Sequence, residues 1–212
     1  MNLDNKYWYF PSAVPHRICD DILRYGKLRK EEQALTGDLN LNRDLTKNPI
    51  TKDELKIIKK KRDSNVVWMS EQWIYNELLP YVHRANENAG WNFEWDQSEH
   101  CQFTKYGKGQ YYGWHTDSSE KPYEGKGLPM GKIRKLTIVL HLSDPSEYEG
   151  GGLEFDFRNR DPDKKPNIRK CKEIAPKGSL VVFPSFMWHR VCPVKRGTRY
   201  SLVIWNLGQP FK

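Results

Sequence analysis

The spacing of hydrophobic residues changes near residue 90 of this 212-residue chain. Before that point, apolar side chains recur every three or four residues in three segments, which predicts amphipathic helices. Pro15 should begin the first helix, which ends near Gly26, and a second should span residues 51–61. Ser70 should cap the third helix, and Pro80 should kink or divide it.

From Phe93 onward, apolar and polar residues alternate with the period of β-strands. Many short strands of this kind predict a sandwich or barrel, with the helices packed against one outer face. Including two strands from the first half, the expected strands cover residues 7–10, 66–68, 93–96, 99–106, 110–115, 133–142, 152–157, 168–174, 179–183, 188–193 and 198–206.

Length and composition indicate one domain with a real core, since 37% of the residues are hydrophobic and 13% are aromatic. We expect a single domain over 1–212, in which 1–92 form a mixed, partly helical support for a β-rich core at 93–207. Polar segments predict three long loops, of which 116–131 is a candidate lid for any site formed just before it. The three loops span 36–50, 116–131 and 158–167.

No run of 18 apolar residues exists, so we expect no membrane-spanning segment. The first residues, Met1–Asn5, include an acid and no apolar stretch, unlike a secretory signal. These features predict a soluble cytoplasmic protein. Its four cysteines form no C-x-x-C pair and should be reduced and buried.

The net charge of +8 would suit nucleic acid, an acidic protein or a small anion. The densest basic run is Lys56–Arg62. Thr51 and Glu54 precede it in the arrangement of a capping box, so we interpret the run as the basic end of a solvated helix.

One short motif offers metal ligands. His115 and Asp117 lie two residues apart at the end of an expected strand, so their side chains should point the same way. With a second histidine they would form a set of two histidines and one carboxylate, which leaves coordination positions open and suits Fe(II). A structural zinc site would instead close all four positions. Candidates for the second histidine are His16, His83, His100, His141 and His189.

We prefer His189 because Arg199 follows it by ten residues. Residues 194–197 resemble a hairpin turn, which would place strands 188–193 and 198–206 side by side.

On the second of these strands, Arg199 should share one face with Ser201, Val203 and Trp205. An arginine on the inner face of a small barrel is unfavourable without an anion. Either the carboxylate of a ligand, gripped by two parallel N–H groups, or a buried aspartate of the chain should therefore pair with it.

Together these residues lie in longer segments that resemble the prolyl 4-hydroxylase-like 2-oxoglutarate/iron oxygenases, especially the bacterial and phage PKHD-type hydroxylases. The resemblance covers about residues 101–207, half the chain, and depends on the order and spacing of the motifs. The N-terminal half is similar more loosely, through Arg62–Trp68. The motifs are Tyr106–Asp117 (YGKGQYYGWHTD), Arg134–Ser143 (RKLTIVLHLS), Tyr148–Phe155 (YEGGGLEF), Pro176–Ser185 (PKGSLVVFPS) and His189–Trp205 (HRVCPVKRGTRYSLVIW).

The resemblance implies a mainly β fold with flanking α-helices around a double-stranded β-helix, the cupin-like jelly-roll. It also implies hydroxylation of an unactivated C–H bond with Fe(II), the co-substrate 2-oxoglutarate and O2, and with ascorbate as a further reductant. His115, Asp117 and His189 match the iron ligands of the family, which form the catalytic centre. Arg199 matches the residue that binds the C5 carboxylate of 2-oxoglutarate.

Four further positions match residues with roles in the family. Tyr106 matches a tyrosine of the co-substrate pocket, and His141 lies where some relatives carry a tyrosine that touches the same carboxylate. Arg134 and Trp205 fall where prolyl hydroxylases place substrate-contacting residues. Each also has a purely structural interpretation: Tyr106 and Trp205 as core residues, His141 as an interior histidine, and Arg134 as a charge at a strand end.

The resemblance therefore implies a prolyl residue in a peptide or protein as substrate, with a free amino acid or small metabolite as the alternative. The oligomeric state stays open. A nucleic-acid demethylase of the AlkB type shares the His-x-Asp motif and would explain the basic charge. That family carries Arg-x-Asn-x-Thr-x-Arg after the last histidine, whereas Arg199–Trp205 lacks the asparagine and the second arginine. We therefore expect no nucleic-acid substrate.

Overall fold

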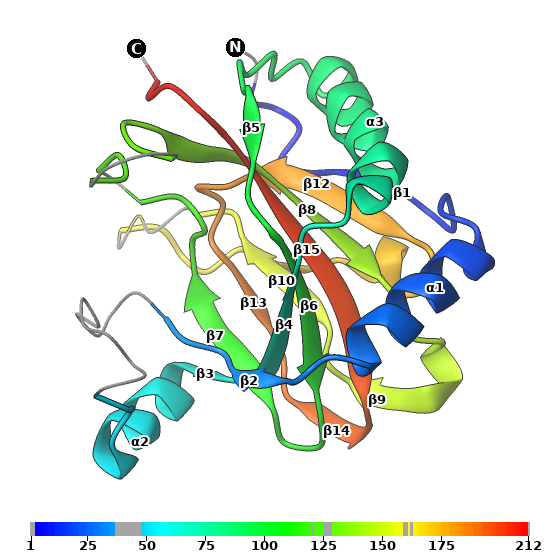
Figure 1. Ribbon diagram of the computed structural model, residues 1–212. Coiled ribbons are helices and arrows are strands. Elements are labelled where there is room, and N and C mark those ends of the chain that lie inside the picture. Colours follow the sequence, from blue (N-terminus) through cyan, green and yellow to red (C-terminus); the bar gives the residue numbers. More distant parts are fainter. Residues whose placement is uncertain are drawn as a thin grey trace.

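The computed structural model describes residues 3–36, 48–119, 121–124, 129–158, 161 and 163–211. Antiparallel strands form the centre of the molecule, and the helices lie outside them (Figure 1). None of the described helices combines the length and the apolar composition that a membrane span requires.

Two antiparallel sheets contain most of the strands. The larger sheet has the order β1 (Trp8–Phe10), β12 (Leu180–Pro184), β8 (Ile133–His141), β15 (Arg199–Gly208), β6 (Cys101–Tyr106), β4 (Asn65–Met69) and β2 (Glu32–Gln33), and β5 (Gln97–Ser98) also pairs with β15. The smaller sheet has the order β11 (Ile168–Lys170), β10 (Leu153–Asp156), β13 (His189–Val191), β7 (Tyr111–His115) and β3 (Arg62–Asp63). A separate pair joins β9 (Tyr148–Gly150) and β14 (Val194–Gly197).

The hydrophobic residues form two cores, one on each face of the larger sheet. Helices α1 (His16–Lys27) and α3 (Gln72–Asn88) cover one face (Figure 1), with residues such as Ile22 and Ile74 against Ile138 of β8. The second core lies between the two sheets and joins Val139 to Phe155. The prediction that the helices pack against one outer face is confirmed for α1 and α3.

The predicted helices are all present. Helix α2 spans Lys52–Lys61, and its N-cap is the expected capping box: the Glu54 N–H donates to Thr51 Oγ1, and the Thr51 N–H donates to Glu54 Oε2. Its last turn carries the basic run, so the interpretation as a helix end is confirmed up to Lys61.

Two details of α3 differ from expectation. Glu71, not Ser70, is its N-cap residue, and the Glu71 carboxylate accepts from the Ser70 N–H. The helix also continues through Pro80 as one element, so the expected division is absent, whereas a kink there stays a prediction. A proline removes one intrahelical hydrogen bond, but burial of Leu78 and Val82 against the core holds the helix together across it.

Most predicted strands are confirmed with shifts of one or two residues at their ends. The strand expected at 93–96 is absent, because the Asn86 side chain binds both the N–H and the C=O of Phe93 and holds this segment in a loop. The strand expected at 168–174 stops at Lys170 and is followed by a 3₁₀ turn, Lys172–Ile174. The short strands β2, β3, β5, β9 and β14 were not predicted.

The predicted hairpin between 188–193 and 198–206 is wrong. Strand β13 pairs with β10 and β7 in the smaller sheet, whereas β15 pairs with β6 and β8 in the larger one. Residues 194–197 are not a turn but strand β14, whose backbone pairs with β9 and carries the chain from one sheet to the other.

Parts of all three predicted loops fall among residues that the structure does not describe: 37–47, 120, 125–128, 159–160 and 162. The lid over 116–131 therefore stays a prediction.

The contact between β14 and the turn before β9 can be tested with two glycines. Gly197 has φ +72°, and an added Cβ would lie 1.9 Å from the backbone O of Glu147. Gly109 has φ +82° but nothing within 4 Å of that position. Gly109→Ala should lower the free energy of unfolding by about 1 kcal/mol from backbone strain alone.

Gly197→Ala should lower the free energy of unfolding by roughly 4 kcal/mol or more, because backbone atoms would also have to move apart. Urea unfolding measures both values. Equal losses in the two variants would contradict the close approach.

Candidate active site

Strand pairing brings two histidines together. His115 ends β7, His189 begins β13, and the two residues are direct partners in the antiparallel register. Asp117 follows β7 by two residues, and its backbone N–H donates to the Ser185 carbonyl just before β13. The possible ligand atoms of the three side chains all lie within 4.8 Å of one another. The structure thus brings together the three residues that the sequence predicted as metal ligands.

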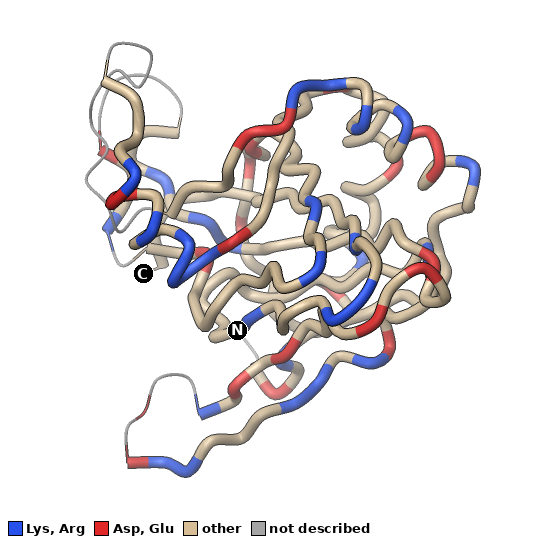
Figure 2. The backbone as a smooth tube through the Cα atoms, turned by 90° about the horizontal axis from the view of Figure 1, so that it is seen from below, with Lys and Arg blue, Asp and Glu red and all other residues tan. Residues whose placement is uncertain are grey.

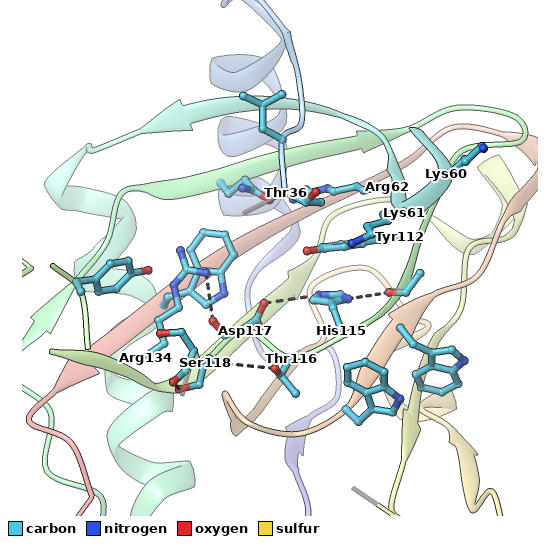
Figure 3. A pocket seen from close by; sticks show the side chains of 18 of the residues that line it. Thr36, Lys60, Lys61, Arg62, Tyr112, His115, Thr116, Asp117, Ser118 and Arg134 are labelled. Atoms are coloured by element: carbon cyan, nitrogen blue, oxygen red, sulfur yellow. Dashed lines mark hydrogen bonds and ion pairs between the residues drawn. The ribbon is translucent and has the colours of Figure 1, made fainter. Parts of the chain in front are cut away.

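The carboxylate lies between the two imidazoles. Nε2 of His115 is 3.6 Å from Oδ1 of Asp117, and Nε2 of His189 is 3.5 Å from Oδ2. Figure 3 shows His115 and Asp117 side by side at the base of a groove. Ligand atoms 3 to 4 Å apart are about as far as adjacent ligands of one metal ion, each roughly 2 Å from it.

Hydrogen bonds orient all three side chains. Nδ1 of His115 is 2.8 Å from the Gly113 carbonyl, and Nδ1 of His189 is 2.8 Å from the Met187 carbonyl. A carbonyl only accepts, so each Nδ1 carries the proton and each Nε2 presents a lone pair. The Thr137 hydroxyl donates to Oδ2 of Asp117 over 2.8 Å.

The surroundings of His189 and Asp117 keep both groups in metal-binding forms. The pKa of His189 is lowered to about 4 by burial and by the neighbouring His115, so its imidazole is neutral near pH 7. Burial alone would raise the pKa of the Asp117 carboxyl, but interactions with the neighbouring His189 and His115 outweigh burial and lower that pKa. The group is therefore ionised.

This donor set fits Fe(II). Two neutral imidazoles and one carboxylate occupy one side of an octahedral ion and leave the other positions for small molecules. No other described His, Cys, Asp or Glu joins the cluster, so within the described residues the site is not a closed zinc site.

Arg199 lines the same inner cavity as the three ligands. Only 2% of its surface is exposed, and Nη1 donates to Ser201 Oγ over 3.2 Å. It forms no ion pair with any described acidic residue, so the alternative of a buried aspartate partner finds no support there. The predicted face is confirmed, because the same cavity is lined by Arg199, Ser201, Val203 and Trp205.

Tyr106 also lines this cavity. It pairs with Arg199 across β6 and β15, and the guanidinium carbon lies 5.6 Å from the centre of its ring. It belongs at the same time to the core between the sheets, so its interpretation as a core residue is confirmed, and its role in a co-substrate pocket stays a prediction.

A wider groove of about 830 Å³ opens over His115 and Asp117 (Figure 3). Arg134 and Trp205 both line it. The Arg134 guanidinium lies 3.8 Å above the Trp205 ring and binds both carboxylate oxygens of Glu99, at 2.7 and 2.5 Å. With 19% of its side chain exposed, Arg134 is a fixed wall of the groove, and its interpretation as a surface charge at a strand end is wrong.

Residues 101–206, half of the chain, match the 2OG-Fe(II) oxygenase superfamily. The chain belongs to this superfamily. All eight predicted site residues lie inside the matched segment.

Curated proteins similar to this chain include PKHD-type hydroxylases. The one from Xanthomonas axonopodis pv. citri is 31% identical over 103 residues, which are 49% of this chain and 41% of that protein. The one from Sphingopyxis alaskensis is 38% identical over 97 residues, or 45% and 38% of the two chains. The aligned part thus spans less than half the length of these relatives.

Solved structures show the same fold at low sequence identity. A viral collagen prolyl hydroxylase from Paramecium bursaria Chlorella virus-1, in complex with 2OG, has a TM-score of 0.61 and 19% identity, with 97% of both chains covered. A Pseudomonas putida prolyl-4-hydroxylase has a TM-score of 0.63 and 17% identity, with 96% of this chain and 93% of that chain covered. The predicted fold, a mainly β jelly-roll with flanking helices, is confirmed.

The wall of the wider groove includes a residue that the sequence analysis did not assign. Arg62 is 4% exposed, and it donates to Ser64 Oγ and to Gln102 Oε1. Its guanidinium lies 4.5 Å from the centre of the Tyr112 ring, which stacks on His115. Side chains alternate between the two faces of β6, so Gln102 lies on the same face as Tyr106. This alternation was the signal in the sequence from which this wall could have been found.

The basic residues of the chain are not gathered at the groove alone. Lys and Arg are spread over many segments and interleaved with Asp and Glu (Figure 2). Lys60 and Lys61 do line the groove, but Arg134 there is already paired with Glu99.

His141 does not line the inner cavity. It is 2% exposed, and its Nε2 lies 3.0 Å from the Tyr148 hydroxyl in a different cavity that also reaches Arg199. Burial and the neighbouring Arg199 lower its pKa to about 3. The imidazole is therefore neutral at physiological pH.

This shift predicts a pH dependence of stability. Between about pH 6.5 and the lowered pKa, the unfolded chain binds a proton at His141 that the folded protein does not, so acidification favours unfolding. From pH 6.5 to 5, the free energy of unfolding of the metal-free wild type should fall more steeply than that of His141→Gln, by up to about 1.4 kcal/mol per pH unit.

Urea unfolding at several pH values measures the two slopes. The exposed His100 provides the control, since His100→Gln should show the same slope of unfolding free energy against pH as the wild type. Identical slopes for His141→Gln and the wild type would show that His141 is not held neutral.

Proposed function

We propose that this chain is an Fe(II)- and 2-oxoglutarate-dependent dioxygenase that hydroxylates an unactivated C–H bond of a prolyl residue in a peptide or protein. The observation that carries the reaction class is an open set of two histidines and one carboxylate in one cavity with a buried arginine that lacks an acidic partner among the described residues. The division into a supporting part, 1–92, and a catalytic core, 93–207, belongs to the same proposal, as does ascorbate as a supporting reductant.

When bound, Fe(II), 2-oxoglutarate and O2 supply the oxidising chemistry, with succinate and CO2 as co-products. His115, Asp117 and His189 would hold the metal. The carbonyls of Gly113 and Met187 keep both imidazoles in the required tautomer, and Thr137 keeps the carboxylate turned towards them. These contacts reduce the reorganisation needed when the metal binds.

Arg199 would bind the C5 carboxylate of 2-oxoglutarate. A buried guanidinium without an anion is unfavourable, and a carboxylate that accepts two parallel N–H groups removes that penalty. Tyr106 and Ser201 flank the guanidinium and would limit where the carboxylate can lie.

The outer groove would hold the substrate. Arg134 is fixed by Glu99 before anything binds, so little side-chain entropy is lost on binding. Trp205 is 5% exposed, and its Nε1 has no acceptor among the described residues. A carbonyl of the substrate would satisfy that donor.

Similar structures support a prolyl peptide as the occupant of this groove. One of them is a Trichoplax adhaerens prolyl hydroxylase in complex with a peptide fragment of hypoxia inducible factor, with a TM-score of 0.59, 14% identity, and 96% of this chain and 84% of that chain covered. A groove of about 830 Å³ is also larger than a free amino acid requires.

Arg199→Ala tests the co-substrate site. The KM for 2-oxoglutarate should rise by roughly 100-fold, because a buried charge-assisted pair is lost. Metal affinity should stay near that of the wild type, whereas His115→Ala should abolish it. Turnover of 2-oxoglutarate and metal titration measure the two effects, with Arg196→Ala on the exposed strand β14 as the control. An unchanged KM in Arg199→Ala would refute the assignment of the carboxylate.

A panel of proline-containing peptides and free amino acids tests the substrate. Mass spectrometry should show that one peptide gains a single oxygen atom. The amount of this product should rise together with the amount of 2-oxoglutarate consumed. Trp205→Phe keeps a ring beneath Arg134 but removes the N–H, and should lower kcat/KM for that peptide about tenfold, the value of one hydrogen bond. A gain of oxygen in a free amino acid alone would overturn the peptide substrate and leave the dioxygenase in place.

A further inference from the structure

A second cavity reaches Arg199 without containing the metal ligands. It has a volume of about 320 Å³ and shares only Arg199 and Leu153 with the inner cavity described above. Gly150, Gly151 and Gly152 form part of its wall, so we call it the glycine-walled cavity.

The glycines keep this cavity open. Gly151 has φ +61°, and a Cβ there would lie 2.9 Å from Cδ of Arg199. A Cβ on Gly152 would lie 3.0 Å from Cε of Lys170. Side chains at these two positions would therefore fill the space above the arginine.

The lining has the chemistry of an anion site. Arg199, Lys170 and Lys172 contribute three basic groups, and none of the described lining residues is acidic. Arg199 is 2% exposed, so its charge cannot be satisfied by bulk water. The neutral imidazole of His141 and the hydroxyl of Tyr148 are hydrogen-bonded to each other, which uses one of their two donor hydrogens and leaves the other for an oxyanion.

We propose that the glycine-walled cavity binds a small tetrahedral oxyanion, a free phosphate or the phosphate of an organic monoester, between Arg199 and the lysines at 170 and 172. The inference rests on the proposed function in one respect: the same guanidinium would face the C5 carboxylate of 2-oxoglutarate in the inner cavity. Two anions that share one cation weaken each other's binding. The oxyanion therefore lowers the affinity for 2-oxoglutarate.

The first experiment measures binding to metal-free protein without 2-oxoglutarate. Inorganic phosphate is titrated by calorimetry and thermal shift, with sodium chloride at equal ionic strength as the reference. The variant Lys170→Ala/Lys172→Ala should bind phosphate about tenfold more weakly, as expected for the loss of two partly exposed charges. Lys108→Ala, an exposed lysine outside the cavity, is the matched control and should bind as the wild type.

Glycerol 2-phosphate in the same titration distinguishes the two sources of the phosphate group. Tighter binding than inorganic phosphate identifies a monoester as the ligand, and weaker binding identifies the free ion. Phosphate effects that match those of chloride, or that are equal in the wild type and the double variant, would overturn the proposal. Since this arm contains neither metal nor co-substrate, its outcome is independent of the dioxygenase assignment.

The second experiment measures coupling during turnover of 2-oxoglutarate. Sulfate is the probe, because phosphate would sequester iron. The KM for 2-oxoglutarate should rise with sulfate in the wild type and rise about tenfold less steeply in the double variant. The same rise in both proteins would show that sulfate acts elsewhere. Absence of any turnover, with phosphate binding intact, would instead count against the dioxygenase and leave the anion site standing.

Discussion

The pairing of β7 with β13 is the contact on which the candidate site depends. It makes His115 and His189 direct partners across two strands whose sequences are more than seventy residues apart. Antiparallel partners have Cβ atoms about 5 Å apart, which is close enough for two imidazoles to share one metal ion. A shift of the register by one residue would turn one histidine to the opposite face of the sheet and dismantle the site.

Burial of charge shapes the rest of the cavity. Asp117, Arg62 and Arg134 are each held by described partners: the two imidazoles, Ser64 with Gln102, and Glu99. Arg199, which is 2% exposed, has hydroxyl and aromatic neighbours but no acidic partner among the described residues. Its missing acidic partner is therefore the most informative feature of the site, because a ligand can supply what the described residues do not.

The sequence predicted the site better than the topology around it. The order His-x-Asp, His, Arg was sufficient to select the four residues that meet in one cavity. The reason given for His189 was nevertheless partly wrong, since β13 and β15 do not form a hairpin. They come close because their two sheets face each other, and packing between sheets leaves no local signal in the sequence.

Local pattern by itself predicted the three helices, most of the strands and the pair of residues that could chelate a metal, and the resemblance of longer motifs indicated the family. These properties depend on neighbours along the chain, where periodicity and spacing act directly. Only the tertiary structure decided that Arg134 is locked to Glu99, that Arg62 joins the groove wall, and that His141 faces a separate cavity. Those outcomes depend on contacts between distant segments and on exclusion of water, which no short stretch of sequence specifies.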